Sequence, residues 1–393
     1  MRQQLEGSRA VAEAVQRCRP QVVATYPITP QTHIIEHLAQ MVADGELAAE
    51  FISAESEFAA ASLVLGAVVG GGRAFTASAS QGLLLMAEVL FNIAGLRLPV
   101  VMICTNRAIS APISICNDHQ DSMALRDAGW IQLYVESNQE AVDSVIQAYR
   151  IAESCELPVM VCMDGFFLTH TFEPVEIPEQ TAVDAFLPPF HFSRALDPAN
   201  PTTLGGGGEP DNYLEYRAEQ HAALENARTV IEAVDAEYGA HIGRRYGGMA
   251  EAYCLEGADT VLLGLGSVMG AVKDVVDQLR GQGQPVGALR LRCFRPFPAA
   301  LLLEQLRNAK RIIVLEKALS VGAGGIVAAE LRAALHHAGR PIPVDGFVAG
   351  LGGRDVTPAV IEEVFRFAAA TAAPATCRFA DLNPAATASL QEK

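Results

Sequence analysis

The chain has 393 residues, of which 50% are hydrophobic and 19% are charged. This length predicts two or three domains with sizeable cores, and the composition excludes a disordered chain. The 45 acidic residues outnumber the 29 basic ones, giving a formal net charge of −16. Because such a charge repels phosphate backbones, nucleic acid is not an expected partner.

The sequence contains no predicted membrane span. Its longest apolar stretch, Phe58 to Gly72, ends at Arg73 and is shorter than the ~18 residues that a spanning helix needs. Charged residues interrupt the first 17 positions before any apolar run, which argues against a secretory signal. None of the eight cysteines has Cys-x-x-Cys spacing, so neither a zinc ribbon nor an iron–sulfur loop is predicted. We expect a cytoplasmic chain with free thiols.

Apolar runs alternate with helical patterns through the first part of the chain, which predicts a parallel sheet covered by helices. The predicted strands are Val22 to Thr25, Glu50 to Ser53, Arg73 to Ala77, Pro99 to Cys104, Ile131 to Val135 and Pro158 to Met163. Two helical faces are predicted by residues 34, 35, 38, 41 and 42 and by residues 141, 145, 148 and 152. We expect a first α/β domain over residues 1–173.

The pattern breaks over residues 174–212, which contain seven prolines and four successive glycines and are typical of a long connection. A polar helical stretch, Tyr213 to Tyr246, follows. It could pack back on the first domain or bridge to another chain, and the sequence does not distinguish these alternatives. We expect residues 174–258 to form this connection and helical segment.

A second alternating block predicts another α/β domain over residues 259–371. Its predicted elements are strands over 260–264, 286–291, 311–315 and 342–347 and helices over 268–279, 299–306 and 326–336. Residues 372–393, rich in Ala and Thr, are expected to form a tail or docking arm. The turn Gly264 to Gly270 has the wrong glycine spacing for a dinucleotide loop, so NAD binding is not favoured.

Three motifs follow predicted strands, where ligands collect in α/β sheets. Tyr26 to Thr32 (YPITPQT) is a site candidate, although Thr29 followed by Pro30 also suits a helix N-cap with proline at the first helical position. Glu57 opens a small, apolar helix, where a glutamate can simply complement the helix dipole.

The third motif is Asn106-Arg107-Ala108, followed by the loop Asn117 to Asp121. Arg107 at a strand end is well placed to hold a carboxylate in bidentate fashion, or it could pair with Asp118 or Asp121 in a structural network. His119 could join these aspartates around a metal, but a hydrogen-bonding role is the more common one for such a histidine.

Together these motifs, with Asp164-Gly165-Phe166 and Leu291 to Phe297 (LRCFRPF), resemble the alpha subunit of the 2-oxoacid:ferredoxin oxidoreductases, especially the pyruvate type. The resemblance implies a parallel-sheet domain of the thiamine-diphosphate pyrimidine type, followed by a domain like the transketolase C-terminal domain. It implies oxidative decarboxylation of a 2-oxoacid to acyl-CoA and CO2. Pyruvate is favoured, while an aryl acid such as phenylglyoxylate or a branched-chain acid remains open.

The resemblance also assigns roles to residues of this sequence. Glu57 is similar in position to the glutamate that bonds the pyrimidine ring nitrogen of thiamine diphosphate and acts as an acid/base group, and Pro27 to a residue whose backbone contacts that ring. Thr29 and Arg107 stand where the family binds the carboxylate of the 2-oxoacid.

The chain lacks a Gly-Asp-Gly diphosphate and magnesium motif and a cysteine cluster for electron carriers. The resemblance therefore implies a complex with a beta subunit that shares thiamine diphosphate and holds Mg²⁺, with gamma and ferredoxin-like delta subunits, and with iron–sulfur clusters in partner subunits. Coenzyme A and ferredoxin or another acceptor are the expected co-reactants. Two alternatives are a non-redox transketolase-type or decarboxylase-type subunit and a noncatalytic scaffold subunit.

Overall fold

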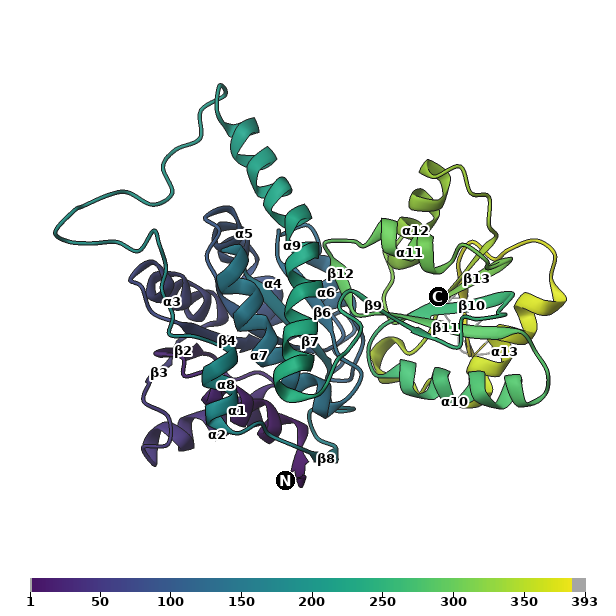
Figure 1. Ribbon diagram of the computed structural model, residues 1–393, viewed down its shortest axis with the longest axis horizontal. Coiled ribbons are helices and arrows are strands. Elements are labelled where there is room, and N and C mark those ends of the chain that lie inside the picture. Colours follow the sequence, from purple (N-terminus) through teal and green to yellow (C-terminus); the bar gives the residue numbers. More distant parts are fainter. Residues whose placement is uncertain (1, 384–393) are drawn as a thin grey trace. The chain divides into compact units, whose positions relative to one another are not determined.

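The computed structural model describes residues 2–383, which form two compact units (Figure 1). The first unit comprises residues 2–251 together with 291–298. The second comprises residues 252–290 together with 299–383. The short stretch 291–298, expected within the second domain, therefore belongs to the first unit.

The first unit is built on a seven-stranded sheet with strand order β12-β6-β7-β5-β4-β2-β3. Its strands are β2 (Val22–Thr25), β3 (Glu50–Ser53), β4 (Ala74–Ser78), β5 (Val101–Asn106), β6 (Ile131–Tyr134), β7 (Val159–Asp164) and β12 (Cys293–Arg295). The six strands from β2 to β7 pair in parallel, and β12 adds antiparallel to β6. The six predicted strands are confirmed to within two residues at each end.

Helices connect these strands. They are α1 (Gly7–Arg17), α2 (Thr32–Ala43), α3 (Glu57–Val69), α4 (Ser80–Leu85), α5 (Ala87–Gly95), α6 (Gln120–Ala124) and α7 (Asn138–Cys155). Two of them, α2 and α7, carry the apolar faces that the sequence predicts, and such a face packs against the sheet. The predicted face of α2 is buried at Ile34, Ile35, Leu38 and Met41, and that of α7 at Ala141, Val145, Ala148 and Ala152. Val42 is partly buried.

The region expected to be a connection contains regular structure. Strand β8 (Phe172–Val175) pairs antiparallel with β1 (Gln3–Glu6), and α8 (Gln180–Phe186) follows. The sequence did not predict β1 because its polar run, Gln3 to Glu6, lacks the apolar alternation of a strand. Residues 187–212 then form the long irregular link.

Helix α9 (Tyr213–Ile242) packs back on the first unit along α7. Ala227, Ile231 and Val234 are buried, and the hydroxyl of Tyr238 lies 2.6 Å from Oδ1 of Asp143. The sequence left open whether this helix packs on the first domain or bridges to another chain. Its carboxyl-terminal half packs on the first domain. Its amino-terminal end projects beyond the other helices (Figure 1).

The second unit is also α/β, with strand order β15-β14-β13-β10-β11-β9. Its elements are β9 (Ala250–Tyr253), β10 (Thr260–Gly264), α10 (Val268–Gly281), β11 (Val286–Leu291), α11 (Ala299–Gln305), β13 (Arg311–Glu316), α12 (Ile326–His337), β14 (Val344–Val348), α13 (Pro358–Ala370) and β15 (Arg378–Phe379). Strands β11, β10, β13, β14 and β15 are parallel in turn. Its core includes Val272, Val276 and Phe365 from α10 and α13.

Part of the expected tail is structured. Strand β15 pairs with β14, and Phe347 and Val348 face Arg378 and Phe379 in register. Residues 372–383 therefore complete the second sheet, and the remainder of the expected tail, 384–393, lies outside the described residues. Within residues 2–383, none of the helices has the length and apolar character needed to cross a bilayer.

Candidate active site at the sheet edge

The predicted site residues follow strands of one parallel sheet. Thr29 follows β2, Glu57 follows β3 and Arg107 follows β5. The carboxyl ends of parallel strands meet at one edge of a sheet, which is the usual place for ligand binding in open α/β folds. These three residues therefore belong to loops or helix starts at the same edge.

Glu57 is the first residue of α3 and is only 7% exposed. The helix is capped by its neighbour, because the Ser56 hydroxyl accepts a hydrogen bond from the Ala59 amide at 3.2 Å. Within the described residues, nothing donates a hydrogen bond to the Glu57 carboxylate. Amide capping thus does not explain this glutamate.

The Glu57 side chain meets the start of α4. A Cβ atom added at Gly82 would lie 2.4 Å from Oε1 of Glu57 and 2.7 Å from Oγ of Ser78. A side chain at this position would therefore force the Glu57 carboxylate or the Ser78 hydroxyl to move. The sequence motifs did not point to Gly82 or Ser78, since both reach Glu57 only through tertiary packing.

Buried polar atoms without hydrogen-bond partners occur on β4, at the start of α4 and on β5. Oγ1 of Thr76, Oγ of Ser78 and Nε2 of Gln81 are buried and have no hydrogen-bond partner among the described residues, and neither has Oγ1 of Thr105 on β5. Leaving such groups buried and unpaired costs stability, so each calls for an explanation such as a bound ligand. The edge of β4 and β5 has the character of a polar binding surface.

Arg107 is 8% exposed, and its guanidinium bonds only backbone oxygens. Nη1 donates to the carbonyl of Thr29 at 3.0 Å and Nε to the carbonyl of Ser114 at 3.1 Å. The structure therefore brings together the two residues predicted to bind a carboxylate. No acidic side chain neutralises this guanidinium within the described residues, which leaves its positive charge available to an anion.

The loop that contains Thr29 is held by Gln31. Its Nε2 donates to Oγ1 of Thr25 at 2.8 Å, and its Oε1 accepts from the amide of Ile28 at 3.2 Å. Helix α2 begins at Thr32, so the interpretation of Thr29 as its N-cap is wrong. Pro27 and Thr29 are exposed on this loop, where a ligand can reach them.

Asp121 links Arg107 to the start of α4. Its Oδ2 accepts from the Ser80 amide at 2.9 Å and from the Arg107 amide at 3.0 Å. Burial raises the pKa of Asp121, and these hydrogen bonds oppose the shift. The predicted network of Arg107 with Asp121 therefore exists, but through the backbone amide rather than the guanidinium.

Ser80 has a positive φ of 49°, a conformation that costs energy for a residue with a side chain. Besides its amide bond to Asp121, its hydroxyl donates to the carbonyl of Ala108. Asp121 and Ala108 thus hold the strained turn that presents Gly82 to Glu57. Strain of this kind is common at functional sites.

Among residues 2–383, His119 belongs to no group of three potential metal ligands. Its Nε2 lies 2.7 Å from Oδ1 of Asp164, and both side chains are 1% exposed. The hydrogen-bonding role predicted as the commoner one is therefore confirmed.

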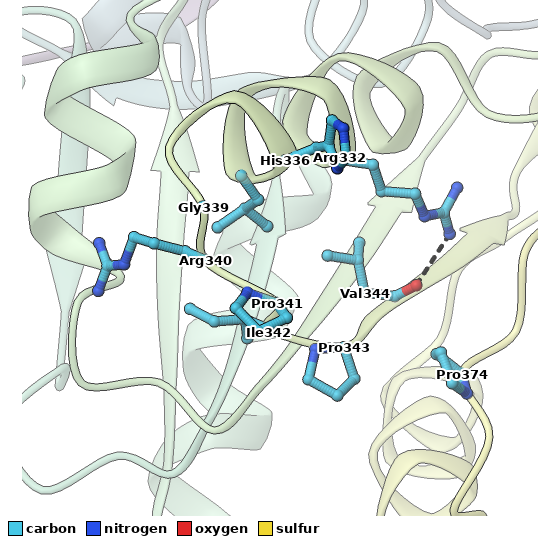
Figure 2. A pocket seen from close by; sticks show the side chains of 10 residues that line it. Arg332, His336, Gly339, Arg340, Pro341, Ile342, Pro343, Val344 and Pro374 are labelled. Atoms are coloured by element: carbon cyan, nitrogen blue, oxygen red, sulfur yellow. Dashed lines mark hydrogen bonds between the residues drawn. The ribbon is translucent and has the colours of Figure 1, made fainter.

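A cavity of about 580 Å³ lies in the second unit between the end of α12 and the loop before β14 (Figure 2). Arg332 lines this cavity, and its Nη2 donates to the carbonyl of Val344 at 2.9 Å. Arg340 likewise donates to the carbonyls of Leu303 and Arg307. Because both guanidinium groups are bound to the backbone, and no predicted site residue lines this cavity, the sheet edge remains the candidate site.

Comparisons with known proteins identify the family of the chain. Residues 13–236 match the family described as pyruvate flavodoxin/ferredoxin oxidoreductase, thiamine diphosphate-binding, and residues 258–361 match pyruvate:ferredoxin oxidoreductase core domain II. The pyruvate synthase subunit PorA of Methanothermobacter thermautotrophicus is 50% identical over 364 residues, which cover 92% of this chain and 94% of the relative.

A second relative has a different named substrate. The ketoisovalerate oxidoreductase subunit VorA of Pyrococcus horikoshii is 45% identical over 355 residues, 90% of each chain. Among solved structures, the 2-oxoglutarate:ferredoxin oxidoreductase of Magnetococcus marinus, with 2-oxoglutarate, coenzyme A and succinyl-CoA bound, has a TM-score of 0.71 at 20% identity. The match covers 93% of this chain and 65% of that one, and it supports the fold. The chain therefore belongs to the pyruvate:ferredoxin oxidoreductase family of 2-oxoacid oxidoreductase subunits, which confirms the family, fold class and enzyme class expected from the sequence.

Proposed function

We propose that this chain contributes Glu57, Thr29 and Arg107 to a complex that oxidises pyruvate to acetyl-CoA and carbon dioxide. The observation that carries the proposal is the presence, at one sheet edge, of two charged groups that lack a charged partner within the described residues. One is the buried Glu57 carboxylate without a donor, and the other is the Arg107 guanidinium without a carboxylate. Each is complementary to one part of the expected ligands.

Thiamine diphosphate suits the surroundings of Glu57. An aminopyrimidine ring offers the hydrogen-bond donors that a buried carboxylate lacks, and the hydroxyl of Ser78 can pair with the same ring. When bound, thiamine diphosphate supplies the nucleophilic carbon and the electron sink that decarboxylation of a 2-oxoacid requires. Glu57 would hold a proton shared with the ring, and Pro27 would contact the ring through its backbone.

Arg107 would orient the substrate. A guanidinium bonds a carboxylate through parallel N–H groups, and Arg107 is fixed by its bonds to the carbonyls of Thr29 and Ser114. Fixing the carboxylate holds the keto carbon in one place for reaction, which is a positioning effect. The relative named for pyruvate favours this acid, while the relative named for ketoisovalerate keeps a branched-chain acid as the second candidate.

The remaining groups belong to other chains in this proposal. A beta subunit would share the thiamine diphosphate and hold its Mg²⁺, and gamma and delta subunits with iron–sulfur clusters would carry electrons to ferredoxin. One 2-oxoacid and one coenzyme A then give acyl-CoA, carbon dioxide and a proton, while an electron pair leaves in single steps. We place this complex in the cytoplasm, and cell fractionation tests that placement.

The test is dye reduction by the purified complex. We expect a viologen dye to be reduced when thiamine diphosphate, coenzyme A and pyruvate are present, with acetyl-CoA as product. Faster reduction with 3-methyl-2-oxobutanoate or phenylglyoxylate would change the assigned substrate. Release of an aldehyde without dye reduction would favour a decarboxylase, and no reaction with any of these acids would reject the proposal.

A further inference from the structure

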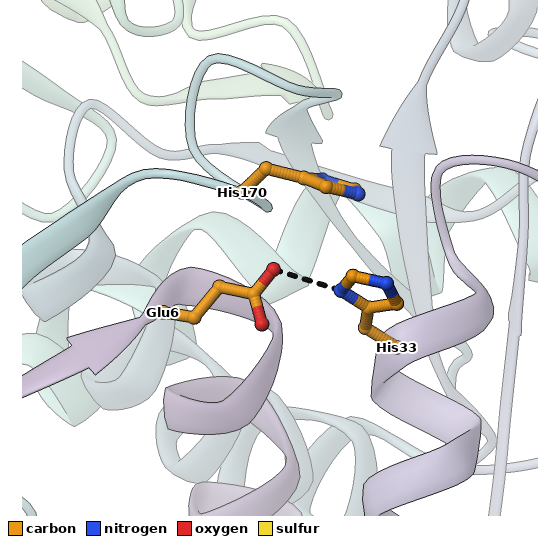
Figure 3. Close-up of side chains that lie close together, drawn as sticks. All are labelled: Glu6, His33 and His170. Carbon is orange, nitrogen blue, oxygen red and sulfur yellow. Dashed lines mark hydrogen bonds and ion pairs between the residues drawn. The ribbon is translucent and has the colours of Figure 1, made fainter.

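Three possible metal-binding side chains converge at the amino-terminal end of the first unit (Figure 3). They are Glu6, at the end of β1, His33, in the first turn of α2, and His170, in the segment between β7 and β8. Their candidate ligand atoms all lie within 4.8 Å of one another. Nδ1 of His33 is 2.8 Å from Oε1 of Glu6, and the two imidazole rings are 4.7 Å apart.

The backbone fixes two of these residues relative to each other. The pairing of β1 with β8 places Glu6 opposite Phe172, and the Gly7 amide bonds the carbonyl of Thr171 at 3.2 Å. The Ser8 amide and hydroxyl both donate to the carbonyl of Thr169 at 2.9 Å. The segment that carries His170 is therefore held to the start of α1, so the cluster rests on ordered structure rather than on a free loop.

The donor set is typical of an open zinc-type site. Two imidazoles and a carboxylate hold Zn²⁺ in many proteins and leave one position for water or a further ligand. His37 lies one turn along α2 from His33, and its Nε2 is 4.0 Å from Oε2 of Glu6. It borders the cluster but does not belong to the group whose candidate ligand atoms all lie within 4.8 Å of one another. Imidazole nitrogen favours borderline ions such as zinc, cobalt and nickel over magnesium or calcium.

A neighbouring hydroxyl orients one of the rings. Nδ1 of His170 lies 2.7 Å from Oγ1 of Thr169, which leaves Nε2 of the ring for a ligand. Bonding of the second ring nitrogen in this way is a regular feature of histidines that bind metals. All three cluster side chains are partly exposed, so an ion can enter from solvent.

We propose that Glu6, His33 and His170 bind one divalent transition-metal ion of the zinc class and leave its fourth position open to water. None of these residues belongs to the machinery assigned to Glu57 and Arg107. The ion would join β1, α2 and the segment before β8, and it would stabilise this end of the first unit. The alternative is a simple hydrogen-bonded Glu6–His33 pair beside the tilted His170 ring, without an ion.

The test uses Co²⁺ as a spectroscopic probe on the full-length chain after treatment with a chelator. We expect saturable visible absorption at one equivalent of Co²⁺, its loss on addition of Zn²⁺, and a higher unfolding midpoint with Zn²⁺ than without. His33→Gln and His170→Gln should each weaken binding at least about tenfold. His191→Gln removes an exposed histidine outside the cluster and should bind as the parent does.

Thr169→Val gives a second variant that keeps every proposed ligand. Because it removes the partner of the His170 ring, affinity should fall roughly 10- to 100-fold. Circular dichroism without metal checks that each variant is folded, and Glu6→Gln replaces any histidine variant that is not. The proposal is overturned if the folded parent binds no Co²⁺, if the cluster variants bind as tightly as the parent, or if thiolate-to-cobalt absorption shows that cysteines hold the ion.

Discussion

Each unit of the molecule buries a glutamate near the start of a helix, and the two are satisfied in opposite ways. Glu316, at the end of β13, accepts hydrogen bonds from the amides of Val327 and Ala328 at 2.8 and 3.2 Å. Glu57 begins α3, whose capping is done by Ser56, and its carboxylate has no donor among the described residues. A glutamate at a helix start is therefore not informative by itself.

The difference lies in what each carboxylate does for the fold. Glu316 satisfies amides that would otherwise be unpaired, so a structural role accounts for its burial. Glu57 makes no such hydrogen bond within the described residues, and the unpaired Ser78 hydroxyl lies close to it at Gly82. We expect the carboxylate without a donor to be the functional one, and the predictions below test this contrast.

Glu57→Gln should have the largest effect. The amide keeps the size of the side chain but cannot exchange a proton as a carboxylate does, so dye reduction by the complex should fall about 10²- to 10⁴-fold. Glu55→Gln, two positions earlier and exposed, is the matched control and should retain parental activity. Parental activity in folded Glu57→Gln would instead favour a scaffold role.

Gly82→Ala should reduce activity by roughly 10²-fold, because the new Cβ would displace the Glu57 carboxylate from its place. Gly66→Ala, a substitution in α3 with open space around the added atom, serves as the control. The measurement is kcat of the complex, with circular dichroism to confirm folding. Equal activity of the two variants would show that contact with Gly82 does not position Glu57 for catalysis.

Arg107→Ala should mainly raise KM for the 2-oxoacid. Loss of a charge-assisted bond of about 1.5 to 3 kcal/mol corresponds to a rise of roughly 10- to 150-fold. KM for coenzyme A should stay near the parental value. Arg19→Ala, which removes an exposed ion pair with Asp184, is the control. An unchanged KM for every 2-oxoacid would remove Arg107 from the substrate site.

Glu316 should affect stability rather than activity. Burial raises the pKa of its carboxyl group from 4.5 to about 7, despite opposing hydrogen bonds from helix amides. The folded chain then binds more protons than the unfolded chain between these values, so the free energy of unfolding should fall as pH rises from about 4.5 to 7. The loss is about 3 kcal/mol.

Urea unfolding at pH 5 and pH 8 checks this effect on the second unit. The parent should lose stability between these pH values relative to Glu316→Gln, which has no carboxyl group to titrate. The same pH dependence in both proteins would show that Glu316 does not carry the effect.

Much of the fold was predictable because both sheets consist largely of continuous apolar strands spaced by helices. The polar strand β1 and the three-residue strand β12 carry no such pattern, so only pairing with β8 and β6 defines them. Helix α13 was missed although Thr357 followed by Pro358 is a recognisable start signal. The strand boundaries thus follow from local sequence, whereas the short added strands depend on tertiary contacts.

The site was predictable in its parts but not in its assembly. Strand ends indicated Thr29, Glu57 and Arg107, and the contact of Arg107 with the Thr29 carbonyl agrees with their proposed common role. Gly82 was not assigned to the site, because its contact with Glu57 joins segments distant in the sequence, whereas Asp121 was expected as a possible partner of Arg107. The roles proposed for Pro27, Thr29, Glu57 and Arg107 remain predictions.

The excursion of residues 291–298 has a practical consequence for dissecting the protein. These residues add β12 beside β6 and place the fully buried Arg292 against Glu140, with Nε of Arg292 3.1 Å from Oε1 of Glu140. The first unit therefore needs a stretch of chain that begins 40 residues after Glu251. A gene truncated after codon 258 would expose the edge of β6 and invite aggregation. A usable fragment of the first unit would need this stretch restored through an engineered linker.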